Sequence, residues 1–257
     1  MSTTYIFAGF AVGLLVGMTG VGGGSLMTPL LTLLFGVSPA VAVGTDLAFA
    51  SITKGAGTIT HRFNRTVQWP IVGRLCLGAL PAALAATLAL KYVGGLDEEI
   101  GGLIRYSIAV SVMLTVLALL FRGRLLAWIG AHPARQLRGR ALAAATVAAG
   151  AVLGLLVTVS SIGAGAIGAT LLVLLYPHLS AAEVAGTDIA YAVPLTAIAA
   201  LGHWWLGSID PALLLTLLIG SVPGITLGAM AARKVPERLL RGLLATTLTG
   251  VAAKLVL

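Results

Sequence analysis

The stretch "GTDLAFASITK" at residues 44–54 returns in altered form as "GTDIAYAVPLT" at residues 186–196. Asp46 and Asp188 occupy the same place in the two stretches, whereas Thr196 stands where the first stretch has Lys54. Nearly all the neighbours of these ionisable residues are apolar. The pattern predicts a chain made of two related copies, with an acid in each copy and a lysine in only one.

Composition places the chain in a membrane. Of its 257 residues, 58% are hydrophobic and 9% are charged, and the mean hydropathy is +1.04. Soluble domains carry about 25% charged residues. Apolar runs of roughly 18 residues or more recur along the whole length, which is typical of transmembrane helices. We therefore expect an all-α polytopic membrane protein, and the first residues are interpreted as mature sequence because no positive segment precedes the apolar run.

The net charge of +8 does not indicate a nucleic-acid partner. The basic residues lie in the short connections between apolar segments, where they set topology and face anionic lipid. Cys76 is the sole cysteine of the sequence, so an intrachain disulfide is excluded and no cysteine-based metal site is expected. The expected partners are the lipid bilayer and a small solute.

Aligned with itself, the sequence matches at a spacing of 141 to 142 residues. "GVGGGS" (20–25) lies against "SIGAGA" (161–166), and "GALP" (78–81) lies against "GSVP" (220–223). The matches keep polar, Gly and Pro positions in register, which hydrophobicity alone would not do. Internal repeats of this kind are typical of secondary transporters and channels, whose binding site lies between the repeats.

Each copy divides into four apolar pieces, of which the first is too long for one span. The expected boundaries are a first repeat at 1–121 (hairpin 5–35, helices 39–61, 69–91 and 103–121), a basic cytoplasmic linker at 122–140, and a second repeat at 141–257 (hairpin 141–176, helices 181–203, 211–232 and 238–256). Glycine-rich breaks interrupt both long pieces. Such backbone is tolerated in a bilayer only where protein or a water-filled cavity surrounds it.

Two topologies follow from these pieces. If each long piece crosses once, eight spans form parallel repeats and the basic residues divide nine against six between the two sides. If each long piece is a re-entrant or broken helical hairpin, each copy crosses three times, the repeats are inverted, and the division becomes twelve against three. The positive-inside rule favours the inverted arrangement, with the N-terminus outside.

The hairpin tips are candidate anion sites. The N-terminus of a returning half-helix presents unpaired N–H groups and the positive end of its dipole. The candidate residues at the two tips are Gly22, Gly23, Gly24, Ser25, Ser161, Gly163 and Gly165. The alternative is that these small residues only allow close helix packing.

The ionisable residues inside the spans are further candidates. Lys54, placed deep in a span, is expected to bind the negative charge of a substrate. Asp46 and Asp188 have two open interpretations: they anchor the hairpin tips, helped by the preceding Thr45 and Thr187, or they carry a coupling proton. His61 and His203 lie at helix ends, where gating or a simple interfacial hydrogen bond would suit them.

No catalytic constellation is present in the sequence. A metalloprotease motif, a nucleophile with its base and a Walker-type loop are all missing, so we expect no enzyme, no cofactor and no metal.

The motifs "GVGGGSLMTPLL" (20–31), "AVGTDLAFASITK" (42–54), "AGTDIAYAVPLT" (185–196) and "GSIDPALLLTLLIGSVPGITLG" (207–228) resemble the sulfite exporter TauE/SafE family, also called the toluene-sulfonate uptake permease family. The resemblance covers essentially the whole chain. It implies a multi-pass transporter of the bacterial inner membrane for small sulfur-containing anions such as sulfite, sulfonates or sulfoacetate. The second copy departs from the first in having "GAG" for "GGG" and no lysine, which argues against a strictly symmetric two-site mechanism.

The expectation is therefore a secondary transporter that exports a small anion by alternating access between two repeats, with proton coupling left open. An anion channel is the first alternative, and a membrane scaffold subunit without transport is the second. The apolar exposed faces are compatible with a monomer or a homodimer.

Overall fold

A computed structural model describes residues 2–19, 24–63, 65–92, 98–131 and 137–232 of the chain. In these ranges the structure is helical and has no strand. The helices are α1 (Ser2–Thr19), α2 (Gly24–Leu34), α3 (Pro39–Phe63), α4 (Trp69–Tyr92), α5 (Glu98–Ala131), α6 (Gly139–Ser160), α7 (Ala166–Leu175), α8 (Ala181–Trp205) and α9 (Pro211–Ala232). The expected last helix, 238–256, lies outside the described residues.

The surface of the bundle is apolar, as a membrane protein requires. Large side chains such as Phe7, Leu77 and Leu201 are about 70% exposed, and many others are at least 40% exposed. Within the described ranges, four helices are long and apolar enough to cross a bilayer: Trp69–Tyr92, Gly139–Ser160, Ala181–Trp205 and Pro211–Gly228. The chain is a polytopic all-α membrane protein.

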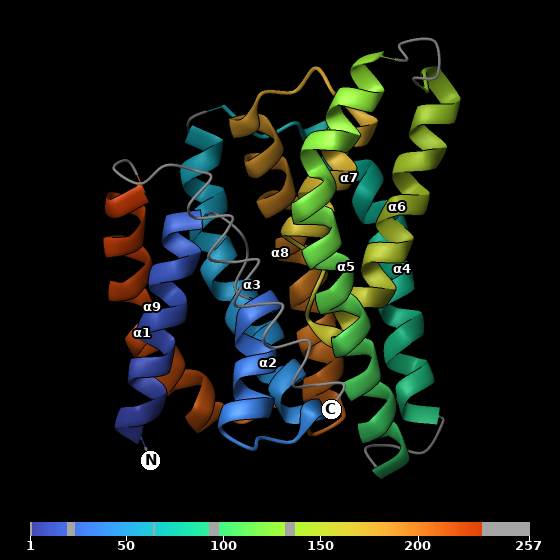
Figure 1. Cartoon of the computed structure of the whole chain (residues 1–257). Helices are drawn as coiled ribbons and strands as arrows, with labels where there is room; N and C mark the ends of the chain where they lie inside the picture. The colour runs from blue at the N-terminus through green and yellow to red at the C-terminus, as the bar shows by residue number, and fades with distance from the viewer. Residues whose placement is uncertain (1, 20–23, 64, 93–97, 132–136, 233–257) are drawn as a thin grey trace.

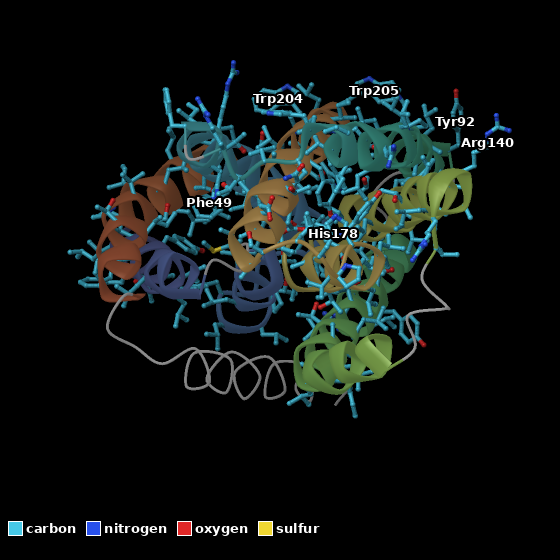
Figure 2. The ribbon with its side chains drawn as sticks, turned by 90° about the horizontal axis from the view of Figure 1, so that it is seen from above. Phe49, Tyr92, Arg140, His178, Trp204 and Trp205 are labelled. Carbon is cyan, nitrogen blue, oxygen red and sulfur yellow. The ribbon has the colours of Figure 1, made fainter. Side chains whose placement is uncertain are left out.

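Aromatic side chains mark one end of the bundle. Trp204 and Trp205, at the end of α8, lie at the periphery, whereas Phe49 lies among the helices (Figure 2). The Lys91 ammonium stands 3.2 Å from the centroid of the Trp205 ring, a cation–π contact. Tryptophan with a neighbouring cation suits the boundary between hydrocarbon and headgroups.

The helices of the two copies run in opposite directions. In Figure 1, α1 and α2 form a hairpin whose outer ends lie at the lower end, and α3 then rises. The hairpin of α6 and α7 has its outer ends at the upper end, and α8 then descends. In the self-alignment, α6 to α9 correspond to α1 to α4, so equivalent helices of the two copies are antiparallel.

Helices of one copy pack against helices of the other copy. α1 of the first copy packs against α9 of the second, and α4 packs against α6 in the same way. Glycine allows both contacts, since a Cβ at Gly78 would meet the Val147 carbonyl and a Cβ at the equivalent Gly220 would meet the Ile6 carbonyl. Small residues that let backbones touch are the usual basis of helix association in lipid.

Reciprocal hydrogen bonds join each of the central helices, α3 and α8, to the residue that precedes α9 or α4 in the other copy. The Asp210 backbone N–H donates to Thr45 Oγ1 over 3.2 Å, and the Gln68 backbone N–H donates to Thr187 Oγ1 over 3.0 Å. Both contacts join a residue of one copy to the equivalent partner in the other. The core between the copies is therefore built from two matching halves.

Local sequence explains where α8 begins. Ser180 and Glu183 form a capping box that starts α8: the Glu183 N–H donates to Ser180 Oγ and the Ser180 N–H donates to Glu183 Oε2. α5 begins at Glu98 and continues to Ala131, so the first ten residues of the expected linker 122–140 are helical.

The close approach of α4 and α6 predicts a position-specific cost. Gly78→Ala places a methyl group against the backbone of residues 147 and 151, and overpacking of this kind costs about 1–3 kcal/mol. We expect a lower midpoint of thermal unfolding for the purified protein in detergent. The matched control is Gly73→Ala in the same helix, where nothing lies within 4 Å of the added Cβ, and that variant should be neutral or slightly stabilised. Equal midpoints for the two variants would contradict the packing.

Candidate functional site

The break between α6 and α7 is a buried piece of irregular backbone. Ser161 ends α6 in the left-handed conformation (φ 57°), and Gly163 and Gly165 have φ of 134° and 144°. Only glycine adopts the last two conformations without strain. Residues 161–166 are all buried, so "SIGAGA" turns inside the protein.

α7 begins at this break without a capping side chain. Its N-cap is Gly165, which makes no side-chain cap hydrogen bond. The positive end of the helix dipole therefore has no capping side chain in front of it. The equivalent break at 20–23 contains Gly22 and Gly23 and lies outside the described residues; Gly24 and Ser25 begin α2, and the Ser25 side chain is not among those described.

Lys54 reaches the break from the other copy. Its side chain is 8% exposed, and Nζ donates a hydrogen bond to the Ala164 carbonyl over 2.8 Å. The ammonium also interacts electrostatically with Asp188 and with Asp46. The structure therefore places Lys54, Ser161, Gly163, Gly165 and the two acids in one region, between α3, α7 and α8.

Asp46 is tied to the first hairpin. Thr28 in α2 donates from Oγ1 to Asp46 Oδ2 over 2.6 Å, and both side chains are completely buried. This bond joins α3 to the returning half-helix of its own copy. Asp46 Oδ1 has no hydrogen-bond partner. Ser161 lies beside this carboxylate, yet its Oγ also lacks a partner of good geometry.

Asp188 lacks the anchor that Asp46 has. Thr170 is the equivalent of Thr28, but it donates to the Ala166 carbonyl in its own helix. Asp188 is 4% exposed, and its Oδ1 has no hydrogen-bond partner. Two acids that are equivalent in the sequence therefore have different surroundings.

Tyr191 is a site residue that the sequence analysis missed. Its side chain is fully buried, and its hydroxyl has no hydrogen-bond partner. The hydroxyl and Asp188 Oδ1 face the same point: a Cβ at Gly168 would meet both atoms. The equivalent residue in the first copy is Phe49, so the hydroxyl, like the lysine, occurs in one copy. That difference was visible in the self-alignment.

The remaining candidates lie at the ends of the central helices. Thr45 and Thr187 accept backbone N–H groups from residues 210 and 68, as described above, rather than bonding to the aspartates that follow them. His203 Nδ1 is 2.8 Å from Ser208 Oγ, and its Nε2 is 2.9 Å from the Thr158 carbonyl oxygen. His61 Nδ1 is likewise 2.8 Å from Thr66 Oγ1. The two threonines therefore bond between the copies, whereas the histidine hydrogen bonds lie within one copy each.

A lateral groove is distinct from this cluster. It has a volume of about 320 Å³ and lies between α3 and α8, where Ile52, Leu201 and Trp204 are among the lining residues. Its lining is almost entirely apolar and opens on the lipid-facing surface. Such a groove suits an acyl chain and not an anion.

The central cluster offers charge and hydrogen bonds. Across the described ranges, no three His, Cys, Asp or Glu residues are close enough together to hold a metal ion. What the cluster has is one ammonium, two carboxylates and two hydroxyls, with four buried oxygen atoms left unpaired: Asp46 Oδ1, Ser161 Oγ, Asp188 Oδ1 and Tyr191 OH. Buried polar atoms are nearly always paired with protein or ordered water, so this concentration makes the cluster the candidate site.

Comparison with known proteins identifies relatives of the chain. The chain is 35% identical over 261 residues to the "Probable membrane transporter protein YjnA" of Bacillus subtilis, with all of both chains covered. It is 28% identical over 251 residues to the "Probable membrane transporter protein YdhB" of the same organism, covering 96% of each chain. No solved structure matches. Residues 5–255 match the family described as "Sulfite exporter TauE/SafE", and the chain belongs to this family of membrane transporters.

Proposed function

We propose that the chain is a secondary transporter that exports a small sulfur-containing or organic anion, such as sulfite, a sulfonate or a sulfoacetate-like anion, across the bacterial inner membrane. The observation that carries the proposal is the buried Lys54 ammonium at the α6–α7 break, surrounded by unpaired polar atoms. An ammonium in hydrocarbon is costly and marks a functional site by default.

The proposed topology is six spans and two re-entrant hairpins in an inverted repeat. α2 and α7 have 11 and 10 residues, so each is about 15 Å long and reaches about half the thickness of the hydrocarbon core. The opposite directions of equivalent helices in Figure 1 support the same topology. So does the division of basic residues, twelve on one side and three on the other.

The anion is proposed to bind between Lys54 and the two breaks. The Ala164 carbonyl uses one of the three Lys54 N–H donors, which leaves two for a ligand. The uncapped start of α7 adds the positive end of its dipole. Discontinuous helices whose N-termini point at an anionic group are the usual binding device of inverted-repeat transporters.

Charge balance supports proton coupling. Lys54 contributes one positive charge, and the two carboxylates contribute two negative charges when both are ionised. The cluster would then carry a net negative charge and repel an anion in a medium of low dielectric constant. Anion binding therefore requires a proton on a carboxylate, which links occupancy of the site to protonation.

Asp188 is the better candidate for this proton. Thr28 in α2 donates a hydrogen bond to Asp46, which favours the carboxylate over the carboxylic acid. Asp188 Oδ1 has no bond to lose. We assign hairpin anchoring to Asp46 and proton coupling to Asp188. The helix ends where the copies would move against each other are assigned to Thr45, Thr187, His61 and His203.

The first test concerns Lys54. Lys54→Gln keeps a hydrogen-bond donor but removes the charge, so we expect substrate-dependent flux in proteoliposomes to fall at least about 100-fold for variant protein that inserts into the membrane. Lys91→Gln is the control, because Lys91 stacks on Trp205 at the periphery, and its flux should be unchanged. Normal flux in Lys54→Gln would remove the anion-site proposal.

The second test separates the two aspartates. Asp188→Asn should make anion flux insensitive to an imposed pH gradient, because the amide cannot exchange a proton. Asp46→Asn can still accept the Thr28 hydrogen bond and should keep the pH-gradient dependence. Asp210→Asn serves as a control, since Asp210 only caps the start of α9. Unchanged pH dependence in Asp188→Asn would make this residue structural.

An anion channel is the competing function, and a scaffold subunit is the next. A channel needs no closed, occluded state, so it would give single-channel currents in a planar bilayer. A scaffold would show no anion-dependent shift of the unfolding midpoint with sulfite, thiosulfate, sulfonates or carboxylates. The unpaired atoms of the cluster favour a site that closes around its ligand.

A further inference from the structure

The groove between α3 and α8 opens on the lipid-facing surface and is separate from the proposed anion site. Its volume is about 320 Å³, and its lining is almost entirely apolar. Two of its lining residues, Ile52 and Leu201, are 54% and 70% exposed. Because the chain lies in a bilayer, a groove with this lining and this opening faces hydrocarbon and not water.

The groove follows the last turns of α8. Ala197, Leu201 and Trp204 line it from this helix, at a spacing that places them on one face. Ala197 precedes Trp204 by seven residues, so the lining extends about 10 Å along the helix axis. Trp204 lies at the periphery of the bundle (Figure 2), and tryptophan suits the boundary between hydrocarbon and headgroups. The groove therefore leads from the headgroup region into the hydrocarbon.

A cation lies beside the headgroup end of the groove. Trp205 follows Leu201 by four residues, so the two side chains are neighbours on the surface of α8. The Lys91 ammonium is 3.2 Å from the centroid of the Trp205 ring, and the Lys91 side chain is exposed. An ammonium has three N–H donors, so contact with one ring leaves donors for a phosphate oxygen.

An acid lies at the same end of the bundle. Asp210 follows Ile209, which lines the groove in the connection between α8 and α9. Its Oδ1 accepts the N–H groups of Ala212 and Leu213 over 2.9 and 3.0 Å, and its side chain is exposed. A carboxylate repels a second negative charge. A headgroup that carries both a phosphate and an amine therefore suits Lys91 and Asp210 better than a headgroup with a net negative charge.

We propose that the groove binds one acyl chain of a zwitterionic phospholipid, whose phosphate binds Lys91 beside Trp205. The inference rests on the chain being a membrane protein and not on the proposed anion transport. A second copy of the chain is a poorer occupant, because α3 and α8 are in contact and a helix with its side chains is about 10–12 Å across. An acyl chain is narrow enough to lie between two packed helices, and it gives their apolar walls dispersion contacts.

The bound lipid contacts both copies, since α3 belongs to the first copy and α8 to the second. A ligand that binds only the folded chain raises the midpoint of thermal unfolding. A lipid concentration ten times the dissociation constant should raise this midpoint by about 3–6 °C.

The experiment titrates the purified full-length chain, in detergent and freed of lipid, with phosphatidylethanolamine or with diacylglycerol of the same acyl chains. Phosphatidylethanolamine should raise the unfolding midpoint to a plateau. Diacylglycerol lacks the phosphate and should bind about tenfold more weakly. Equal titration curves for these two lipids would overturn the phosphate contact.

Phosphatidylglycerol with the same acyl chains tests the zwitterionic headgroup. Its headgroup has the phosphate but no amine, so it should bind no more tightly than phosphatidylethanolamine. Tighter binding of phosphatidylglycerol would overturn this part of the proposal.

Two variants assign the binding to the groove. Ala197→Leu places a larger side chain among the lining residues and should weaken phosphatidylethanolamine binding about tenfold or more. Its control is Ala85→Leu, because Ala85 is exposed on α4 and does not line the groove; this variant should bind as the wild type does. Lys91→Gln should weaken phosphatidylethanolamine binding about tenfold and leave diacylglycerol binding unchanged.

The unfolding midpoint without lipid shows whether each variant is folded, and Lys91→Gln tests the site even if Ala197→Leu does not fold, because Lys91 is exposed. Wild-type affinity for phosphatidylethanolamine in folded Ala197→Leu, or in Lys91→Gln, would overturn the proposal. So would a dimer of the lipid-free chain that Ala197→Leu dissociates, since the groove would then bind a second copy.

Discussion

The hydrogen bond from the Lys54 ammonium to the Ala164 carbonyl is the contact on which the centre of the molecule depends. A break in a helix inside hydrocarbon frees backbone groups that no solvent can satisfy, and a charged side chain in the same medium needs a partner. Here the Lys54 ammonium of one copy pairs with a backbone carbonyl freed by the helix break of the other copy. The bond therefore also joins the two copies at the centre of the molecule. It uses one of the three N–H donors of the ammonium.

Around this bond the structure is symmetric in its frame and asymmetric in its chemistry. The glycine contacts and the paired threonine bonds occur twice, once in each direction between the copies. The lysine, the Tyr191 hydroxyl and the anchored carboxylate occur once. A symmetric frame can take up two equivalent arrangements of similar energy, whereas a single set of charged and polar groups gives the solute one place to bind. The proposed alternating access would use this division.

Composition and apolar periodicity predict the polytopic helical class, and the quoted motifs carry the resemblance to the TauE/SafE family. The sequence also singled out Lys54 and the two acids, because ionisable residues stand out against apolar neighbours. It did not predict that Thr28 bonds to Asp46 while Thr170 turns back on its own helix. Both threonines occupy the same register, and only side-chain geometry separates them. Tyr191 was missed for a different reason: a tyrosine among apolar residues looks like core until its unpaired hydroxyl is seen.

The exchange of helices between copies has a consequence for biosynthesis. α1 is among the first helices to leave the ribosome, but it packs against α9, about 200 residues later in the chain. Until α9 is made, the glycine face of α1 has only lipid or the insertion machinery to contact. Contacts so distant in sequence form late, so the membrane must hold a partly assembled first copy throughout synthesis of the second. For the same reason, one copy alone would lack the helices against which α1 and α4 pack.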